Sequence, residues 1–142
     1  MDTSVVTALA AAVSRPCWRR GWRSGRRRAR WLAYEITRLQ DLYRQFIEEA
    51  STCYVDALQH NEPDIAGLVR LYAKLGRMRT LSSSKVLECA GRIERQIIET
   101  YLVPDKSFLE LREVINSKSV DLLGEFSATC RAEFDSLRAK QF

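Results

Sequence analysis

The sequence predicts an all-α fold: an antiparallel helical bundle of about four to five helices with one long N-terminal helix, preceded by a basic, disordered arm. Three prolines and six glycines are few for 142 residues, and the chain is rich in strong helix formers. Apolar side chains recur at spacings of three and four, the period of a helix that buries one face. Because this length suffices for a single hydrophobic core, we expect residues 1–30 to form the arm and residues 31–142 one helical domain.

The long helix is predicted from an apolar stripe in which spacings of four and three alternate, as in a heptad repeat. The stripe consists of Leu32, Ile36, Leu39, Tyr43, Phe46, Ala50, Cys53 and Ala57. Because Ala50, Cys53 and Ala57 are small for the seam of a coiled coil, we expect the stripe to be buried within its own chain. A coiled-coil homo-oligomer is the alternative.

Turn-forming residues separate this helix from the next two. The run 60–62 and Pro63 end the long helix, and Asp64 supplies a carboxylate to the start of the second. The serines at 82–84 separate the second helix from the third and offer hydroxyls that can cap its first turn.

The last third of the chain contains two more predicted helices. Pro104 ends the third helix, and Ser107 with Glu110 forms a capping box at the start of a short fourth helix. A polar break at 116–119 precedes the final helix. The faces expected to be buried are Ile65, Leu68, Leu71, Tyr72, Leu75 and Met78 in the second helix, Val86, Ala90, Ile93, Ile97 and Tyr101 in the third, Phe108, Leu111 and Ile115 in the fourth, and Leu123, Phe126, Cys130, Phe134 and Leu137 in the last.

The cysteines and the single histidine lack the spacing of a metal site. The cysteines are Cys17, Cys53, Cys89 and Cys130. They stand far apart, and only His60 is available to join them. We therefore expect no bound metal, reduced structural thiols and a reducing compartment.

No catalytic motif is present in the sequence. It has no Gly-rich phosphate loop, no HExxH sequence and no nucleophile elbow. His60 falls at a helix end, and Glu48 and Glu49 fall on the polar face of the long helix, as solvated residues do. The sequence thus predicts a non-enzymatic protein without a cofactor.

Positive charge is concentrated in the first 34 residues. These contain eight arginines, no lysine and one acidic residue, Asp2, for a formal charge of +7. The remaining 15 basic and 17 acidic residues give −2. All three tryptophans, Trp18, Trp22 and Trp31, lie among the arginines.

Two kinds of partner suit such an arm. Clustered arginines neutralise nucleic-acid phosphates while aromatic rings stack on bases. The same residues suit an anionic membrane, where tryptophan settles at the headgroup level. The candidate phosphate- or lipid-binding residues are Arg19, Arg20, Arg23, Arg26, Arg27, Arg28, Arg30, Trp18 and Trp22. A solvated arm that binds nothing is the third interpretation.

The most membrane-like stretch is the apolar run 5–13. A spanning helix needs about 20 consecutive apolar residues, so this run is too short to cross a bilayer. It also does not suit a secretory signal, because Asp2 precedes it and the arginines follow it. An organellar transit peptide is an alternative that the acid-poor, Arg-rich composition leaves open.

Several segments together resemble a known group of proteins. They are MDTSVVTALAA at 1–11, LYRQFIEEAS at 42–51, LYA at 71–73, RMR at 77–79 and the stretch 126–133. The chain resembles short, uncharacterised bacterial membrane-anchored proteins, in which a transmembrane helix is followed by a basic stretch and a cytoplasmic helical tail. The resemblance implies a membrane-associated interaction module at the inner face of the bacterial inner membrane, with a protein partner for the helical tail. It supplies no catalytic residues.

The chain departs from that group between Ser14 and Arg30, where arginine, tryptophan and glycine replace the membrane span. Codons exist for residues 14–23 that, read one base later, encode the apolar run Ala-Gly-Leu-Val-Gly-Gly-Val-Ala-Gly. Our hypothesis is that this segment is an out-of-frame reading of an ancestral membrane helix. The nucleotide sequence tests it, because codons without an apolar run in either shifted frame would rule it out.

Overall fold

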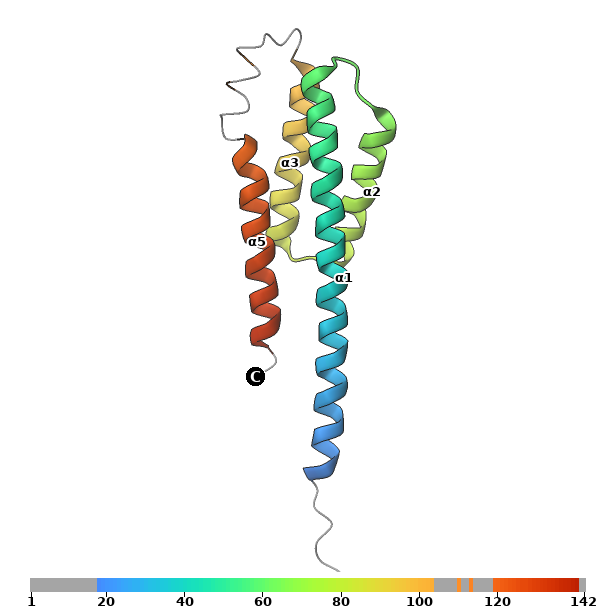
Figure 1. Cartoon of the computed structure of the whole chain (residues 1–142), viewed down its shortest axis with the longest axis vertical. Helices are drawn as coiled ribbons and strands as arrows, with labels where there is room; N and C mark the ends of the chain where they lie inside the picture. Colours follow the sequence, from blue (N-terminus) through green and yellow to red (C-terminus); the bar gives the residue numbers. More distant parts are fainter. Residues whose placement is uncertain (1–17, 104–109, 111–112, 114–118, 141–142) are drawn as a thin grey trace, which may run out of the picture.

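The structure is a computed structural model that describes residues 18–103, 110, 113 and 119–140, with side chains from residue 25 to 103, at 110 and 113, and from 122 to 140 (Figure 1). The described chain contains four helices and no strand. The helices are α1 (Trp18–Gln59), α2 (Ile65–Leu81), α3 (Ser84–Leu102) and α5 (Ser119–Ala139). They run alternately up and down (Figure 1), so the predicted all-α antiparallel bundle is confirmed.

Helix α1 is longer than the sequence indicated. It begins at Trp18 rather than near Leu32 and spans 42 residues, or about 63 Å at about 1.5 Å per residue. Residues 18–30 of the basic arm therefore continue the helix. The expected disorder otherwise falls on residues 1–17, which lie outside the described residues.

Helix α1 is the centre of the bundle because it packs against each of the other described helices. Helices α3 and α5 also pack closely against each other, whereas α2 lies mainly along α1 and touches α3 only lightly. Figure 1 shows α5 and α2 on opposite sides of α1.

The core is formed by the predicted stripes. From Ile36 to Ala57 every position of the α1 stripe is buried within this chain, and Leu42, which the stripe omits, is buried as well. All five predicted positions of α3 are buried. On α5, Phe126, Cys130 and Phe134 are buried, while Leu123 and Leu137 pack partly buried against the core.

The predicted face of α2 is only partly correct. Leu71, Leu75 and Met78 are buried against α1, but Ile65 and Tyr72 are exposed. Apolar residues extend around more of α2 than one neighbouring helix can cover. This helix consequently keeps an exposed apolar strip.

The breaks between helices fall where the sequence placed them. Asp64 is the N-cap residue of α2 and Ser83 that of α3, although neither side chain makes a capping hydrogen bond. The predicted short fourth helix lies outside the described residues except for Glu110 and Glu113, which are both helical.

Candidate functional site: the basic stalk of helix α1

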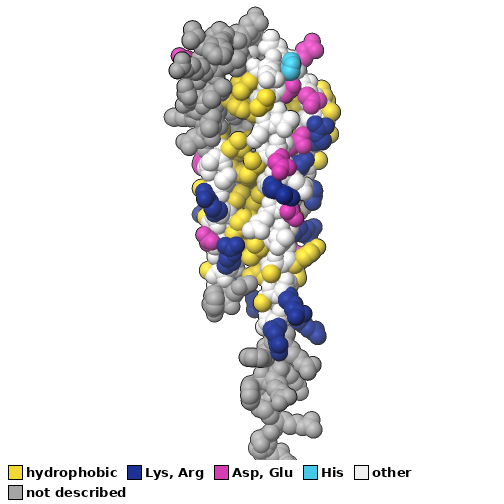
Figure 2. Space-filling view, in the orientation of Figure 1, with side chains coloured by type: hydrophobic (Ala, Val, Ile, Leu, Met, Phe, Trp, Pro, Cys, Tyr) yellow, Lys and Arg dark blue, Asp and Glu magenta, His cyan; other side chains and the backbone are white. Residues whose placement is uncertain are grey.

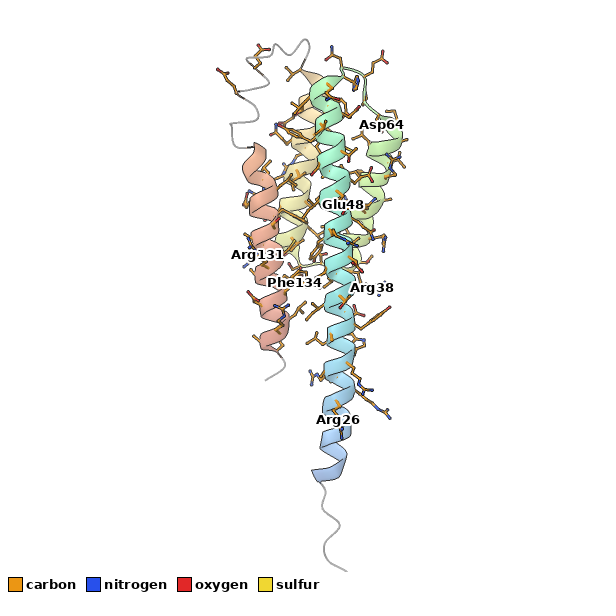
Figure 3. All side chains as sticks on the ribbon, viewed as in Figure 1. Arg26, Arg38, Glu48, Asp64, Arg131 and Phe134 are labelled. Atoms are coloured by element: carbon orange, nitrogen blue, oxygen red, sulfur yellow. The ribbon has the colours of Figure 1, made fainter. Side chains whose placement is uncertain are left out.

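The part of α1 that precedes the bundle is the candidate site. Ile36 is the first side chain of α1 that is buried in the core, and Leu32 is half-buried beside it. We call residues 18–34 the stalk. In Figure 1 it extends beyond the end of α5, and in Figure 3 Arg26 lies on it well away from the other labelled residues.

The described arginines of the stalk are all exposed. They are Arg26, Arg27, Arg28 and Arg30. In Figure 2 dark-blue Lys and Arg side chains gather at the lower end of the described part of α1. The side chains of the other candidates, Arg19, Arg20, Arg23, Trp18 and Trp22, lie outside the described residues, so only their positions on the helix are known.

The helical register sorts the candidate residues onto two sides. At about 100° per residue, six of the seven candidate arginines fall within an arc of about 120°, and Arg28 lies outside it. The apolar stripe of the bundle continues into the stalk with its alternation of four and three unbroken. Its positions in the stalk are Trp18, Trp22, Gly25, Ala29 and Leu32. These fall on the side away from the six arginines, so the stalk is amphipathic.

Two exposed aromatic rings stand where the stalk meets the bundle. Trp31 is 63% exposed and Tyr34 is 65% exposed. The sequence prediction grouped Trp31 with the arginines but missed Tyr34. The spacing of Arg27, Trp31, Tyr34 and Arg38 could have revealed it, because four, three and four residues place side chains on one face.

The charge of the stalk is not balanced within its own sequence. No acidic residue lies between Thr3 and Tyr34. The first carboxylate after the stalk is Glu35, whose Oε1 lies 4.0 Å from Nη1 of Arg38. The arginines are close together relative to the Debye length of about 8 Å at physiological salt, so they present a shared positive potential to an anionic surface.

Polar side chains form further clusters elsewhere in the bundle. Each one joins helices through hydrogen bonds between its own members. The first is Glu49 on α1, which accepts hydrogen bonds from Arg70 Nε at 2.9 Å and Lys74 Nζ at 3.1 Å on α2. Burial alone would raise the pKa of Glu49, but the hydrogen bonds from Lys74 and Arg70 outweigh it, so the pKa is lowered from its usual 4.5.

The second cluster lies at the C-terminal end of α1. Asp56 accepts a hydrogen bond from the Tyr101 hydroxyl of α3 at 2.5 Å, and its other oxygen lies 2.8 Å from His60 Nδ1. The hydrogen bond from Tyr101, with that from His60, lowers the pKa of Asp56. Burial, together with Asp56, raises the pKa of Tyr101 above its usual range, so the phenol is held neutral.

The third cluster joins α1, α3 and α5. Glu133 accepts hydrogen bonds from the Tyr43 hydroxyl and, at 2.8 Å, from the backbone N–H of Ser83. Ser82 Oγ lies 2.9 Å from the Tyr43 hydroxyl, whose one proton goes to the carboxylate, so Ser82 is the donor. Burial, together with Glu133, raises the pKa of Tyr43 well above its usual 10.0. This neutral, hydrogen-bonded phenol stabilises the bundle and is not positioned as a base.

The acid stability of the bundle is expected to depend on Glu49. Because its pKa is lower in the folded chain, the unfolded chain binds more protons below pH 4.5, and stability falls as the pH decreases through that range. Above pH 4.5 this contribution should be constant. Urea unfolding of wild type and Glu49→Gln at pH 7 and pH 3 measures it: the difference in unfolding free energy between the two chains should shrink at pH 3. An unchanged difference would contradict the assignment.

Two of the three described cysteines, Cys53 and Cys130, have no reactive setting. Cys53, Cys89 and Cys130 are buried and free, as expected, while Cys17 lies outside the described residues. Burial raises the pKa of Cys130 to about 12, and burial also raises that of Cys53. Both are therefore neutral thiols at physiological pH.

A small apolar cavity lies between α1, α3 and α5. Its volume is about 20 Å³, room for a single water molecule. Its lining includes Ala50, Tyr54 and Ile97. Figure 2 shows hydrophobic side chains along this side of the molecule, between α5 and α1.

The described residues provide neither a metal site nor a membrane-spanning helix. Among them, no group of His, Cys, Asp and Glu side chains is placed to hold a metal ion. None of the described helices has the length and apolarity that a membrane crossing requires.

Comparison with known proteins gives no relative: no protein-family model, no curated protein and no solved structure matches the chain. The resemblance to bacterial membrane-anchored proteins therefore stays a prediction.

Proposed function

We propose that the protein is a non-enzymatic interaction module that binds an anionic membrane surface through the stalk of α1 and holds the helical bundle beside that surface for a protein partner. The observation that carries the proposal is the stalk itself, an amphipathic helix beyond the end of α5 with six of its seven arginines on one side and an apolar stripe on the other. An in-plane membrane helix needs this arrangement, with basic residues at the lipid phosphates and apolar residues at the acyl boundary.

Nucleic acid is the competing partner, and the register of the stalk favours lipid. A groove that binds single-stranded nucleic acid requires a line of basic side chains with aromatic rings beside it, and Trp31 and Tyr34 would supply those rings. It does not require an apolar stripe on the other side of the helix. Trp18 and Trp22 occupy positions on that stripe, which a membrane interface accounts for and a nucleic acid does not.

The expected location follows from the same placement. With the stalk on the inner face of a bacterial inner membrane, the bundle lies on the cytoplasmic side. The resemblance places the helical tail of the related group there as well. A stalk that rests on the surface takes the position of their membrane span.

Removing four of the seven arginines of the stalk is expected to weaken binding to anionic vesicles strongly. The quadruple variant R26Q/R27Q/R28Q/R30Q removes four exposed charges, each contributing about 1 kcal/mol near an anionic surface, so affinity should fall several hundredfold, by about 4 kcal/mol. Flotation with phosphatidylglycerol vesicles, against phosphatidylcholine vesicles, measures the loss. The matched control R44Q/R77Q/R95Q/R131Q removes the same charge from exposed sites on the bundle and should bind nearly as wild type does.

Tryptophan fluorescence separates lipid from nucleic acid. In variants that retain one tryptophan each, lipids brominated on their acyl chains should quench Trp18 and Trp22 strongly and Trp31 weakly. The proposal is contradicted if all three behave alike, or if the chain binds single-stranded DNA more tightly than anionic vesicles at the same salt concentration.

A further inference from the structure

The exposed apolar strip on α2 is the second unpartnered surface of the molecule. Ile65 is 64% exposed, Val69 is 61% exposed and Tyr72 is 55% exposed. Their spacings of four and three continue to Gly76 and Arg79, so the five residues form one row along α2. No described part of the chain covers this row.

We propose that this row binds the same row of a second copy of the chain, with the two α2 helices antiparallel across a two-fold axis. A two-fold interface must be self-complementary, because both copies use the same surface. If one residue contacts a second residue of the other copy, that second residue contacts the first in return. The row satisfies this condition in size and in charge. The inference is independent of the proposed membrane binding.

The side chains complement one another in size. When Val69 lies opposite Tyr72 of the second copy, the register places Ile65 opposite Gly76. A Cβ added at Gly76 would meet no atom within 4 Å, so open space lies over this residue. The large Ile65 side chain can therefore sit over the glycine of the other copy, as a knob sits in a hole. Ala66 and Ala73 beside the row are exposed and small, and they let the helices approach.

The charges also favour the antiparallel direction. Helix α2 contains four basic and no acidic residues, and the acidic Glu62 precedes its start. Arg70 and Lys74 are turned to Glu49 on α1. By its position in the helix Arg77 falls off the row, and Arg79 falls on it. Its guanidinium lies 5.5 Å from the centre of the Tyr72 ring. In the antiparallel arrangement the end of α2 that carries Arg79 comes beside the turn before α2 of the second copy, which contains the exposed Glu62, whereas parallel helices would place Arg79 beside Arg79.

Only one helix from each copy takes part, so the interface is at the small end of the range for specific dimers. A dimer that dissociates on dilution is therefore expected. Sedimentation velocity of the full chain over about a hundredfold concentration range should show a monomer–dimer equilibrium.

The central substitution Val69→Glu should raise the dimer dissociation constant at least about tenfold, because it places a carboxylate from each copy in the apolar row. The matched control is Val55→Glu, which makes the same change at a 50% exposed valine on α1 and should leave the dimer intact. Because both valines are exposed, circular dichroism should show both variants folded.

Charge reversal tests the direction of the helices. Arg79→Glu and Glu62→Arg should each weaken the dimer, and the double variant R79E/E62R should restore it. The proposal is overturned if the wild type is monomeric at every concentration, if Val69→Glu dimerises as well as wild type, or if neither single reversal weakens the dimer.

Discussion

Replacing Phe126 with alanine is expected to lower the free energy of unfolding by about 3–5 kcal/mol, the usual cost of removing a buried phenylalanine ring. Phe126 is fully buried on α5. Its ring centre lies 5.1 Å from that of Phe46 and 5.9 Å from that of Tyr43, both on α1. The substitution thus opens a cavity where α5 joins the central helix. Urea unfolding followed by circular dichroism at pH 7 measures the change.

The control for this prediction is Leu102→Ala, because Leu102 is 75% exposed at the end of α3. This change should alter stability by no more than about 0.5 kcal/mol. In the double variant F46A/F126A the two losses should not add, since the rings share one contact. A loss below about 1 kcal/mol for Phe126→Ala would mean that α5 does not pack against α1 as described.

Replacing Glu133 with alanine is expected to cost about 2–3 kcal/mol. The substitution removes two charge-assisted hydrogen bonds, one from Tyr43 and one from the backbone N–H of Ser83. It also removes a carboxylate from the N-terminus of α3, where the helix dipole favours a negative charge. Urea unfolding measures the change in the free energy of unfolding.

Two variants distinguish the loss of the hydrogen bonds to Glu133 from a general effect of removing a negative charge. Glu133→Gln keeps the shape and one acceptor oxygen, so it should lose about half as much stability as the alanine variant. Asp135→Ala removes a carboxylate from the same helix. The ion pair of Asp135 with Arg138, at 3.5 Å, is exposed, so the substitution should lower the free energy of unfolding by less than about 0.5 kcal/mol. Equal losses for Glu133→Ala and Asp135→Ala would contradict the assignment.

Much of the bundle could be predicted because its signals are local. The α1 stripe alternates by four and three from Ile36 to Ala57, and a helix with such a stripe has one side to bury. Pro63 and the serines at 82–84 interrupt the pattern at the observed breaks. These features depend on neighbours within a few residues in the sequence.

The sequence prediction placed the start of α1 too late, because it gave the charge of the arm more weight than the helix propensity of its residues. Arginine is a strong helix former, and no proline occurs between Pro16 and Pro63. The apolar stripe also continues through Trp22 and Ala29 into the stalk, although Gly25 weakens it. The sequence thus contained the signal for one continuous helix.

Other features depend on which helices meet, and the sequence pattern does not specify that. Helix α2 is apolar on more than one side, so only its packing against α1 decides that Leu71 is buried and Tyr72 exposed. The hydrogen bond from Tyr43 to Glu133 joins residues 90 positions apart. For the candidate site, composition identified the arginines, but the separation of arginines from the apolar stripe required a helix through residues 18–34.

The central claim is that amphipathic helices bury their apolar faces in a bundle that starts at the end of the stalk and does not need it. The most direct test is circular dichroism with urea unfolding on a chain shortened to residues 31–142. Our account predicts a strongly helical spectrum and a single cooperative transition at the urea concentration found for the full chain. A spectrum of strand or coil, or a gradual loss of signal without a transition, would contradict it.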